Sequence, residues 1–338
     1  MTTNPIRIGI VGTNFVSDWL AEAAATLDSV KITAVYSRKQ ETGDVFAQKH
    51  GIKNVFCDYE SFLSSDTIDA VYIASPNFAH CEQTVSALNH KKHVLCEKVI
   101  AADSGQLSSM IAAARENGCV LMEAMRPAHD PCLDVVREQL PKLGKLRRVV
   151  LDYCQYSSRY DKFRAGEILN AFNPDYSNAA VMDIGCYIIH VAAMLFGKPR
   201  GVLSSSVILH NGFEGAGHVI LDYGDMKAEL SYSKITESVT PNLFMGEDGT
   251  LTLGKITMPR DMKILYHHGS PNLGNAGCEE EIIPFTPAEN NMIYELEDFA
   301  RLCREGCVEH PYLDASVTAL AIIDEIRRQN HIVFPSDR

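Results

Sequence analysis

The first part of the chain alternates short apolar runs with longer amphipathic stretches. Residues 6–11 (IRIGIV) form a mostly apolar run that ends at Gly12, which is typical of a strand buried on both faces. Further strands are predicted at 31–37, 55–59, 68–75, 92–96 and 119–123, and helices at 15–27, 38–51, 78–90 and 103–117. Strands that alternate with helices of this length predict βαβ units, right-handed crossovers and a parallel, doubly wound Rossmann sheet of about six strands.

The pattern changes after a predicted helix near 131–140, where strands predominate. They are predicted at 147–156, 201–210, 217–224, 226–233, 243–254 and 262–268, with helices at 181–196, 289–304 and 314–329. Short turns at Tyr223-Gly224-Asp225 and Glu247-Asp248-Gly249 join consecutive strands, which predicts a mostly antiparallel sheet. We therefore predict an α/β domain over residues 1–125 and an α+β domain over 126–338.

Composition narrows the class of protein. A chain of 338 residues exceeds the roughly 250–300 residues that one core usually serves, so two domains are expected. The net charge of −12 argues against nucleic acid and anionic membranes as partners. No apolar stretch reaches the roughly 18 residues of a membrane span, and the N-terminus lacks signal-peptide features, so a cytoplasmic location is expected. The ten cysteines are scattered without a CxxC pair, which predicts reduced thiols and no metal site.

The first strand–helix junction predicts a phosphate-binding turn. In dinucleotide-binding proteins a GxGxxG turn brings the backbone close to a pyrophosphate at a helix N-terminus. Here Gly12 takes the first position, Asn14 replaces the second glycine, and Ser17 stands at the third. Asparagine tolerates a left-handed backbone, so we expect the substitution to be accepted. A plain βα turn is the alternative, but the βαβ series favours cofactor binding through Gly12, Thr13, Asn14, Phe15 and Val16.

The end of the second predicted strand favours NADP over NAD. An acidic residue there would bind the ribose 2′-hydroxyl of NAD, whereas this chain has Ser37-Arg38-Lys39. A hydroxyl and cations suit a 2′-phosphate through charge-assisted hydrogen bonds, so Ser37 and Arg38 are assigned to the cofactor. The alternative is that the two cations are solvated residues at a helix start.

Two further groups carry candidate chemistry. Glu97-Lys98 follows a strand, where residues of open α/β sheets face the ligand crevice, although an ordinary surface ion pair is equally compatible. In the apolar segment 181–196, Asp183 and Tyr187 are four residues apart and share a helical face, with His190 near it. For His190, a satisfied core histidine is the alternative to a role in the site.

These residues together resemble the glucose–fructose oxidoreductase / inositol dehydrogenase / rhizopine catabolism (Gfo/Idh/MocA) family of oxidoreductases, nearly end to end. The resemblance rests on the turn at 12–17, Ser75-Pro76-Asn77 with His80, Glu97-Lys98, Glu123-Ala124, Asp183-Ile-Gly185-Cys-Tyr187, and a closing helix followed by Phe334-Pro335. Three positions depart from the family pattern. Val99 replaces a proline after Lys98, Asn178-Ala179 replaces a glycine run, and an arginine is displaced to Arg126.

The resemblance implies that residues 1–125 form a dinucleotide-binding Rossmann domain and that residues 126–338 form a substrate-binding and oligomerisation domain. The second domain would have a large open sheet, one face over the active site and the other against a partner subunit. It implies a nicotinamide cofactor, with Lys98, Asp183 and Tyr187 at the catalytic centre. Tyr187 stands where many members have histidine and the glucose–fructose oxidoreductase and dihydrodiol dehydrogenase branch has tyrosine. Ser75, Asn77, His80 and Glu97 are assigned to the cofactor, and Arg126 and His190 to possible substrate binding.

We therefore predict an NAD(P)-dependent oxidoreductase that transfers a hydride between nicotinamide C4 and a sugar, polyol or related carbonyl compound. Lys98 would hold the substrate oxygen, Tyr187 would be the general acid and base, and Asp183 would orient Lys98 or a substrate hydroxyl. A homodimer or homotetramer through the second domain's sheet is expected. Two alternatives remain open: NAD-dependent glycosidase-type chemistry with tightly bound cofactor, and a non-catalytic dinucleotide-sensing regulator.

Overall fold

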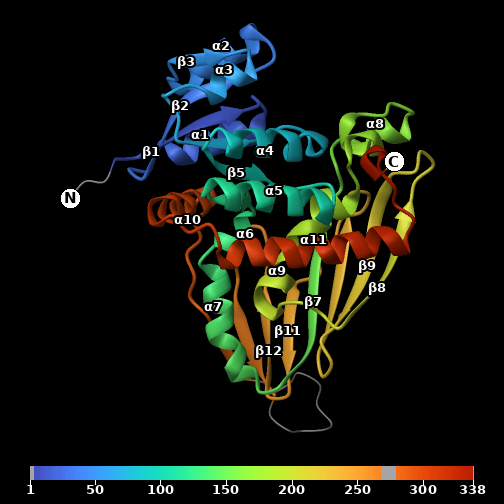
Figure 1. Cartoon of the computed structure of the whole chain (residues 1–338). Coiled ribbons are helices and arrows are strands. Elements are labelled where there is room, and N and C mark those ends of the chain that lie inside the picture. The colour runs from blue at the N-terminus through green and yellow to red at the C-terminus, as the bar shows by residue number, and fades with distance from the viewer. Residues whose placement is uncertain (1–3, 268–278, 338) are drawn as a thin grey trace. The chain divides into compact units, whose positions relative to one another are not determined.

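The chain folds into two compact units (Figure 1). The structure is a computed structural model that describes residues 4–267 and 279–337. The first unit comprises Met1–His129 and Glu289–Val317, and the second comprises Asp130–Ala288 and Thr318–Arg338. The first unit therefore contains a returning segment that the predicted division at residues 125 and 126 did not include. The boundary between residues 125 and 126 therefore remains a prediction.

The first unit is built on a six-stranded parallel sheet, as predicted. Its strands are β1 (Ile6–Val11), β2 (Val30–Tyr36), β3 (Asn54–Phe56), β4 (Ala70–Ile73), β5 (His93–Glu97) and β6 (Leu121–Ala124). Their order is β3-β2-β1-β4-β5-β6, and every neighbouring pair is parallel. The order reverses between β1 and β4, the switch point at which open α/β sheets bind ligands.

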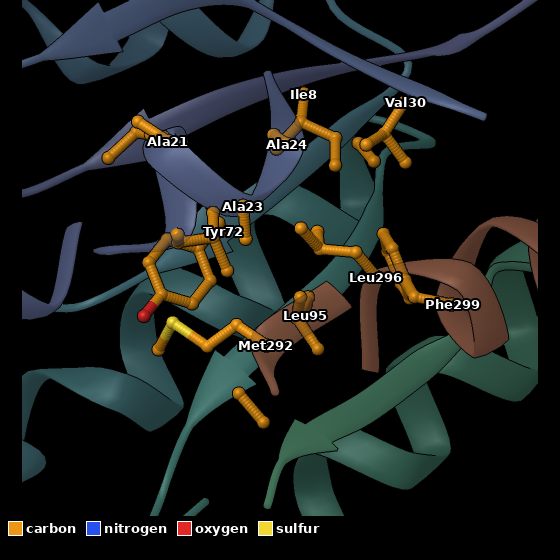
Figure 2. Close-up of a cluster of buried hydrophobic side chains, with 14 of the residues drawn as sticks. Ile8, Ala21, Ala23, Ala24, Val30, Tyr72, Leu95, Met292, Leu296 and Phe299 are labelled. Carbon is orange, nitrogen blue, oxygen red and sulfur yellow. The ribbon is translucent and has the colours of Figure 1, made fainter. Parts of the chain in front are cut away.

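Helices from both segments of the first unit bury its sheet. Its helices are α1 (Phe15–Ala24), α2 (Gln40–His50), α3 (Tyr59–Leu63), α4 (His80–Asn89), α5 (Ser104–Asn117), α6 (Arg126–His129) and α10 (Met292–Glu305). Figure 2 shows Met292, Leu296 and Phe299 of α10 in one apolar cluster with Tyr72 and Leu95 of the sheet. The returning helix therefore completes the core of this unit.

One predicted strand was too long. The expected strand at 55–59 ends at Phe56, and helix α3 begins at Tyr59. The Asp58 side chain accepts a hydrogen bond from the Ser61 backbone N–H at 2.8 Å, which caps this helix. The strand therefore ends before Asp58, because Asp58 caps a helix that begins at the next residue.

The second unit is built on an eight-stranded sheet that is mostly antiparallel, as predicted. Its strands are β7 (Leu146–Cys154), β8 (Gly201–Ile208), β9 (Glu214–Asp222), β10 (Lys227–Ser233), β11 (Asn242–Gly246), β12 (Gly249–Leu253), β13 (Lys263–Tyr266) and β14 (Glu280–Ile282). Their order is β14-β13-β12-β11-β7-β10-β9-β8, and of these pairs β7 and β10 are parallel. The last residue of the expected strand 262–268 lies outside the described residues, and β14 was not predicted.

The second unit also contains several short helices and one longer helix. They are α7 (Cys132–Gln139), α8 (Tyr160–Arg164), the turns η2 (Leu140–Leu143), η3 (Asn170–Phe172), η4 (Pro174–Tyr176) and η6 (Pro335–Asp337), the π-turn η5 (Val181–Gly185) and α9 (Cys186–Phe196). The predicted helix at 181–196 is therefore a π-turn continued by an α-helix. Helix α11 (Pro311–Gln329) contains the boundary between the units. Within the ranges that the structure describes, no helix has the length and apolar character needed to cross a membrane.

The two faces of the eight-stranded sheet differ. The π-turn and α9 pack on one face, over β7, β9 and β10 (Figure 1). On the other face, cross-strand neighbours form a row from β8 to β14: Leu203, Ile220, Glu229, Val150, Leu243, Thr252, Lys263 and Ile282. Leu203 is 68% exposed and Ile282 is 73% exposed. We call this row the open sheet face.

Candidate active site

The turn after β1 requires glycine. Gly12 has φ +98°, and a Cβ atom there would lie 2.9 Å from the carbonyl oxygen of Ala74. Both the positive φ and the close carbonyl disfavour any side chain. No side chain therefore covers the backbone at Gly12, which is the close approach that a pyrophosphate at a helix N-terminus needs.

Asn14 is held by capping and has an extended backbone. Its φ is −89° and its ψ is 177°, so the expectation that asparagine is accepted here for its left-handed tolerance was wrong. Its side-chain oxygen accepts hydrogen bonds from the backbone N–H groups of Val16, at 2.9 Å, and Ser17, at 3.2 Å. Its amide nitrogen donates to the carbonyl of Ala74 at 2.8 Å. Asn14 therefore begins α1 and fastens the turn to the end of β4.

The end of β2 presents cations to solvent and buries a hydroxyl. Ser37 is buried, and its hydroxyl contacts the Thr42 hydroxyl at 2.6 Å and donates to the carbonyl of Lys39 at 3.0 Å. Arg38 and Lys39 are exposed. The Ser37 hydroxyl therefore stabilises the start of α2, and Arg38 is the predicted cofactor residue whose side chain is exposed at this strand end.

Lys98 directly follows β5 and lies beside a carboxylate with two partners. Glu97 accepts a hydrogen bond from the Tyr72 hydroxyl at 2.5 Å and another from the Lys98 backbone N–H at 3.2 Å. Burial raises the pKa of Glu97, while the Tyr72 hydrogen bond and the positive charges of Lys98 and Arg126 act in the opposite direction. Lys98 is partly exposed, and its backbone directly follows the end of β5. Its side chain therefore starts from a fixed position and is accessible from solvent.

His80 supports the same strand ends from within the core. It is fully buried, and its two ring nitrogens lie 3.0 Å from the carbonyl oxygen of Val99 and 2.8 Å from that of Ser75. Burial lowers the pKa of His80. A neutral imidazole has one N–H, so it donates to one of these carbonyls at a time. A side chain without exposed surface acts on a bound cofactor only through its neighbours.

Two further carboxyl groups lie buried in the first unit. Glu123 accepts a hydrogen bond from the Ile100 backbone N–H at 3.0 Å, and burial raises its pKa to about 7. Glu295 of α10 has no exposed surface, and neither carboxyl oxygen has a hydrogen-bond partner among the residues described. Burial, together with the nearby negative charge of Glu97, raises the pKa of Glu295 well above its usual value. Arg126 lies over the Trp19 ring at 5.7 Å, and its positive charge opposes that rise.

In the second unit the predicted site residues lie on the π-turn and α9. The Asp183 side chain is 39% exposed, and its carboxylate forms an ion pair with Lys234 at 2.8 Å. Tyr187 is 8% exposed and meets the Tyr153 ring edge-on, with 5.6 Å between the ring centroids. His190 is buried, so of the three it is the residue least able to reach a substrate.

A buried carboxyl fastens the π-turn to the sheet. Glu214 accepts hydrogen bonds from the Val181 backbone N–H at 2.7 Å, the Tyr232 hydroxyl at 2.8 Å and the Ser206 hydroxyl at 2.6 Å. A Cβ atom at Gly185 would lie 2.9 Å from the Tyr232 ring, so the turn packs tightly on β10. π-Turns inside helices occur often at functional sites, which fits the position of Asp183.

Comparison with known proteins decides the family. Residues 6–125 match the GFO_IDH_MocA profile, described as the oxidoreductase family with an NAD-binding Rossmann fold. Over 335 residues the chain is 42% identical to scyllo-inositol 2-dehydrogenase (NADP(+)) of Bacillus subtilis (strain 168), covering 98% of this chain and 99% of that protein. The chain belongs to the Gfo/Idh/MocA oxidoreductase family.

More distant members of the Gfo/Idh/MocA family extend the comparison. Trans-1,2-dihydrobenzene-1,2-diol dehydrogenase of Xenopus laevis is 26% identical over 336 residues, covering 97% of this chain and 98% of that protein. The solved structure of a 3-ketoreductase from Actinomadura kijaniata with NADP and TDP-benzene has the same fold, with a TM-score of 0.82 and 23% identity, covering 96% of this chain and 98% of that one. The protein is an NAD(P)-dependent oxidoreductase that transfers a hydride to or from hydroxyl or carbonyl groups of sugar-like or polyol compounds.

The structure also reveals supporting residues that the sequence analysis missed. Tyr72 donates a hydrogen bond to Glu97, and Glu214 accepts one from the Val181 N–H, two residues before Asp183. Lys234 forms an ion pair with Asp183 itself. One signal was available for Lys234. The alternation of Leu230 and Tyr232 along β10 continues to Lys234, which places a charge on the buried side of a strand.

Proposed function

We propose that this oxidoreductase uses NADP and oxidises a secondary alcohol of a cyclic polyol or closely related sugar. One observation carries the proposal: the end of β2 has no acidic residue and exposes Arg38, while Lys98 stands at the end of β5 of the same sheet. The 42% identical relative bears the name scyllo-inositol 2-dehydrogenase (NADP(+)), which supports both the cofactor and the substrate class.

The residues of the first unit fit a bound dinucleotide. The turn at Gly12 carries no side chain, which suits a pyrophosphate. The backbone of Thr13 and Phe15 would lie around it, and the Asn14 side chain holds Val16 in the same turn. Arg38 would bind the 2′-phosphate through charge-assisted hydrogen bonds. Ser75 and Asn77 would lie on the nicotinamide side, where His80 and Glu97 would act by positioning the strand ends.

Each catalytic role follows from the chemistry of one side chain. When bound, NADP supplies the hydride acceptor at C4 of its nicotinamide. The Lys98 ammonium would donate a hydrogen bond to the substrate oxygen and stabilise negative charge there. Tyr187 as the phenolate would take the hydroxyl proton during oxidation, and as the phenol it would return that proton during reduction. Asp183, paired with Lys234, would accept a hydrogen bond from a second substrate hydroxyl. Arg126 stays a candidate for substrate binding.

We propose further that the protein is a cytoplasmic homodimer or homotetramer that associates through the open sheet face. That face exposes Leu203 and Ile220 as cross-strand neighbours at one end of the row and Ile282 at the other end, and exposed apolar groups that lie together mark association sites. Ile220→Lys should shift the sedimentation coefficient toward the monomer, whereas Lys263→Arg in the same row should not. An unchanged oligomer in Ile220→Lys would exclude this face.

The proposed activity is tested by screening cyclic polyols, sugars and dihydrodiols with NADP and with NAD. We expect turnover of a cyclic polyol and a higher kcat/KM with NADP. Arg38→Ala should reduce the preference for NADP by about 10-fold or more, because a hydrogen bond to a charged group is lost. Lys31→Ala, at the opposite end of β2, is the matched control. A preference for NAD would contradict the cofactor assignment.

The screen also separates the other two candidate functions. A non-exchanging NAD that copurifies with the protein, with glycoside cleavage, would indicate glycosidase-type chemistry. Cofactor binding without turnover of any compound would indicate a dinucleotide-sensing regulator. Either result would contradict the proposed dehydrogenase.

A further inference from the structure

A buried lysine of the second unit, Lys234, forms an ion pair with the partly exposed carboxylate of Asp183. The Lys234 side chain is only 3% exposed. Its ammonium donates hydrogen bonds to the Asp183 carboxylate at 2.8 Å and to the carbonyl of Ala171 at 2.6 Å. It also lies 5.0 Å and 5.1 Å from the ring centroids of Phe172 and Phe213. The surroundings are therefore those of a desolvated cation with a specific counter-ion.

The backbone of Lys234 is also held, by hydrogen bonds on both sides of the residue. The Lys234 N–H donates to the carbonyl of Gly215 at 2.9 Å, and its carbonyl accepts from the Ser157 N–H at 2.9 Å. Phe172 and Phe213 are fully buried in one apolar cluster, so the rings beside the ammonium are themselves fixed in position. The position of the ammonium is thus set by the sheet, independently of any substrate.

Asp183 differs from its partner in exposure. Its side chain is 39% exposed, whereas that of Lys234 is nearly covered. The Asp183 backbone belongs to the π-turn, which Glu214 binds through the Val181 N–H. A carboxylate that is fixed at its base, paired with a buried cation and partly exposed can accept a hydrogen bond from a ligand at its exposed surface.

We propose that Lys234 is a positioning residue that holds Asp183 as an oriented anion, so that Asp183 acts as a hydrogen-bond acceptor for a substrate hydroxyl. This inference rests on the proposed function, because it assigns a support to one of its site residues. It excludes a role for Asp183 as a proton donor. It also predicts a preference for substrates that carry a hydroxyl beside the reacting carbon.

The difference in exposure between the two partners makes the pair testable. Removing the Asp183 charge leaves the buried Lys234 ammonium without its counter-ion, whereas removing both charges is much less harmful. If Lys234 acts on catalysis only through Asp183, its removal has no further kinetic effect once the Asp183 carboxylate is gone.

The experiment is a double-mutant cycle with Lys234→Met and Asp183→Asn, assayed with scyllo-inositol and NADP or with the best polyol from the screen. Lys234→Met should lower kcat/KM by about 10²-fold through misplacement of Asp183, with an unchanged NADP dissociation constant. The double variant should match Asp183→Asn in kcat/KM within about two-fold. Lys227→Met at the start of β10, which breaks the exposed pair with Asp222 of β9, should behave like the wild type.

Thermal stability provides a second readout that does not depend on activity. Asp183→Asn should lower Tm by leaving the Lys234 ammonium unpaired, and adding Lys234→Met should restore part of that loss. If Lys234→Met alone fails to fold, comparing Asp183→Asn with the double variant still decides the question. A double variant with markedly lower kcat/KM than Asp183→Asn, or with no recovery of Tm, would overturn the inference.

Failure of the inference can be told apart from failure of the proposed function. Lys98→Ala is assayed in parallel, because it lies in the other unit and outside the Lys234 pair. If Lys98→Ala loses turnover while the cycle shows independent effects, only the role of Lys234 is wrong. If Lys98→Ala and Asp183→Asn both keep wild-type turnover, the proposed function itself is wrong.

Discussion

The two units hold their polar groups in different ways. In the first unit, Asn14 caps the backbone of Val16 and Ser17, and Glu97 binds the N–H of the residue beside it. In the second unit, Asp183 is held by Lys234, a residue from a different element. The first unit therefore holds its polar groups mainly through hydrogen bonds to backbone groups, both near in sequence and distant. The second unit holds Asp183 through an ion pair between the side chains of two distant residues.

This difference indicates which substitutions each unit tolerates. A turn built from neighbouring backbone depends on the conformation of one or two residues, so a single side chain at Gly12 disturbs it. An ion pair between distant elements depends on both partners, so it tolerates paired changes better than single ones. The predictions below test this contrast, beginning with the largest expected effect.

Replacing Lys98 with alanine should reduce turnover most. We expect kcat to fall by about 10²-fold or more, with little change in the NADP dissociation constant, because the ammonium contributes to the chemical step. Lys53→Ala, an exposed lysine of the same unit, is the control. Steady-state kinetics and cofactor titration provide the measurement, and near-normal turnover would refute the role of Lys98.

Replacing Gly12 with alanine should weaken cofactor binding with little effect on the substrate residues. The positive φ and the nearby Ala74 carbonyl oppose a Cβ atom, so the turn that holds the cofactor must shift. Strain of about 1–3 kcal/mol corresponds to a loss of about 5- to 150-fold in NADP affinity. Gly51→Ala is a matched control, since Gly51 has φ +66° with no atom within 4 Å of the added carbon. It should lower stability and leave NADP affinity unchanged. Equal affinities of the two variants for NADP would contradict the account of the turn.

The same contrast explains how much the sequence could predict. Strand–helix alternation predicted the six-stranded sheet, and the turns at Gly224 and Asp248 predicted neighbouring antiparallel strands, because both are local patterns. The second unit's family-level architecture followed from the resemblance. The pairing of Lys234 with Asp183, and of Glu214 with the π-turn, could not be predicted because it depends on which strands become neighbours. Asparagine favours N-cap positions, so the capping role of Asn14 agrees with its local propensity, whereas the left-handed backbone expected for it does not occur.

Glu295 should make the protein less stable as pH rises. Its pKa is raised in the folded state, so above the ordinary glutamate pKa the unfolded chain ionises first and the folded chain retains the proton. The free energy of unfolding should therefore fall with increasing pH, by up to about 1.4 kcal/mol per pH unit relative to Glu295→Gln. Urea unfolding between about pH 5 and pH 8 measures this difference in slope. Glu297→Gln, an exposed position on the same helix, should keep the wild-type slope. A Glu295→Gln slope equal to that of the wild type would contradict the buried neutral carboxyl.

The central claim is hydride transfer from a polyol carbon to NADP. The most direct test uses scyllo-inositol deuterated at its carbinol carbons, with the holoenzyme and NADP, and locates the label by NMR of the reduced cofactor. The account predicts deuterium at C4 of the nicotinamide and an oxidised polyol in equal amount, with both lost in Lys98→Ala. Unlabelled reduced cofactor, or a polyol left unoxidised by the active enzyme, would contradict it.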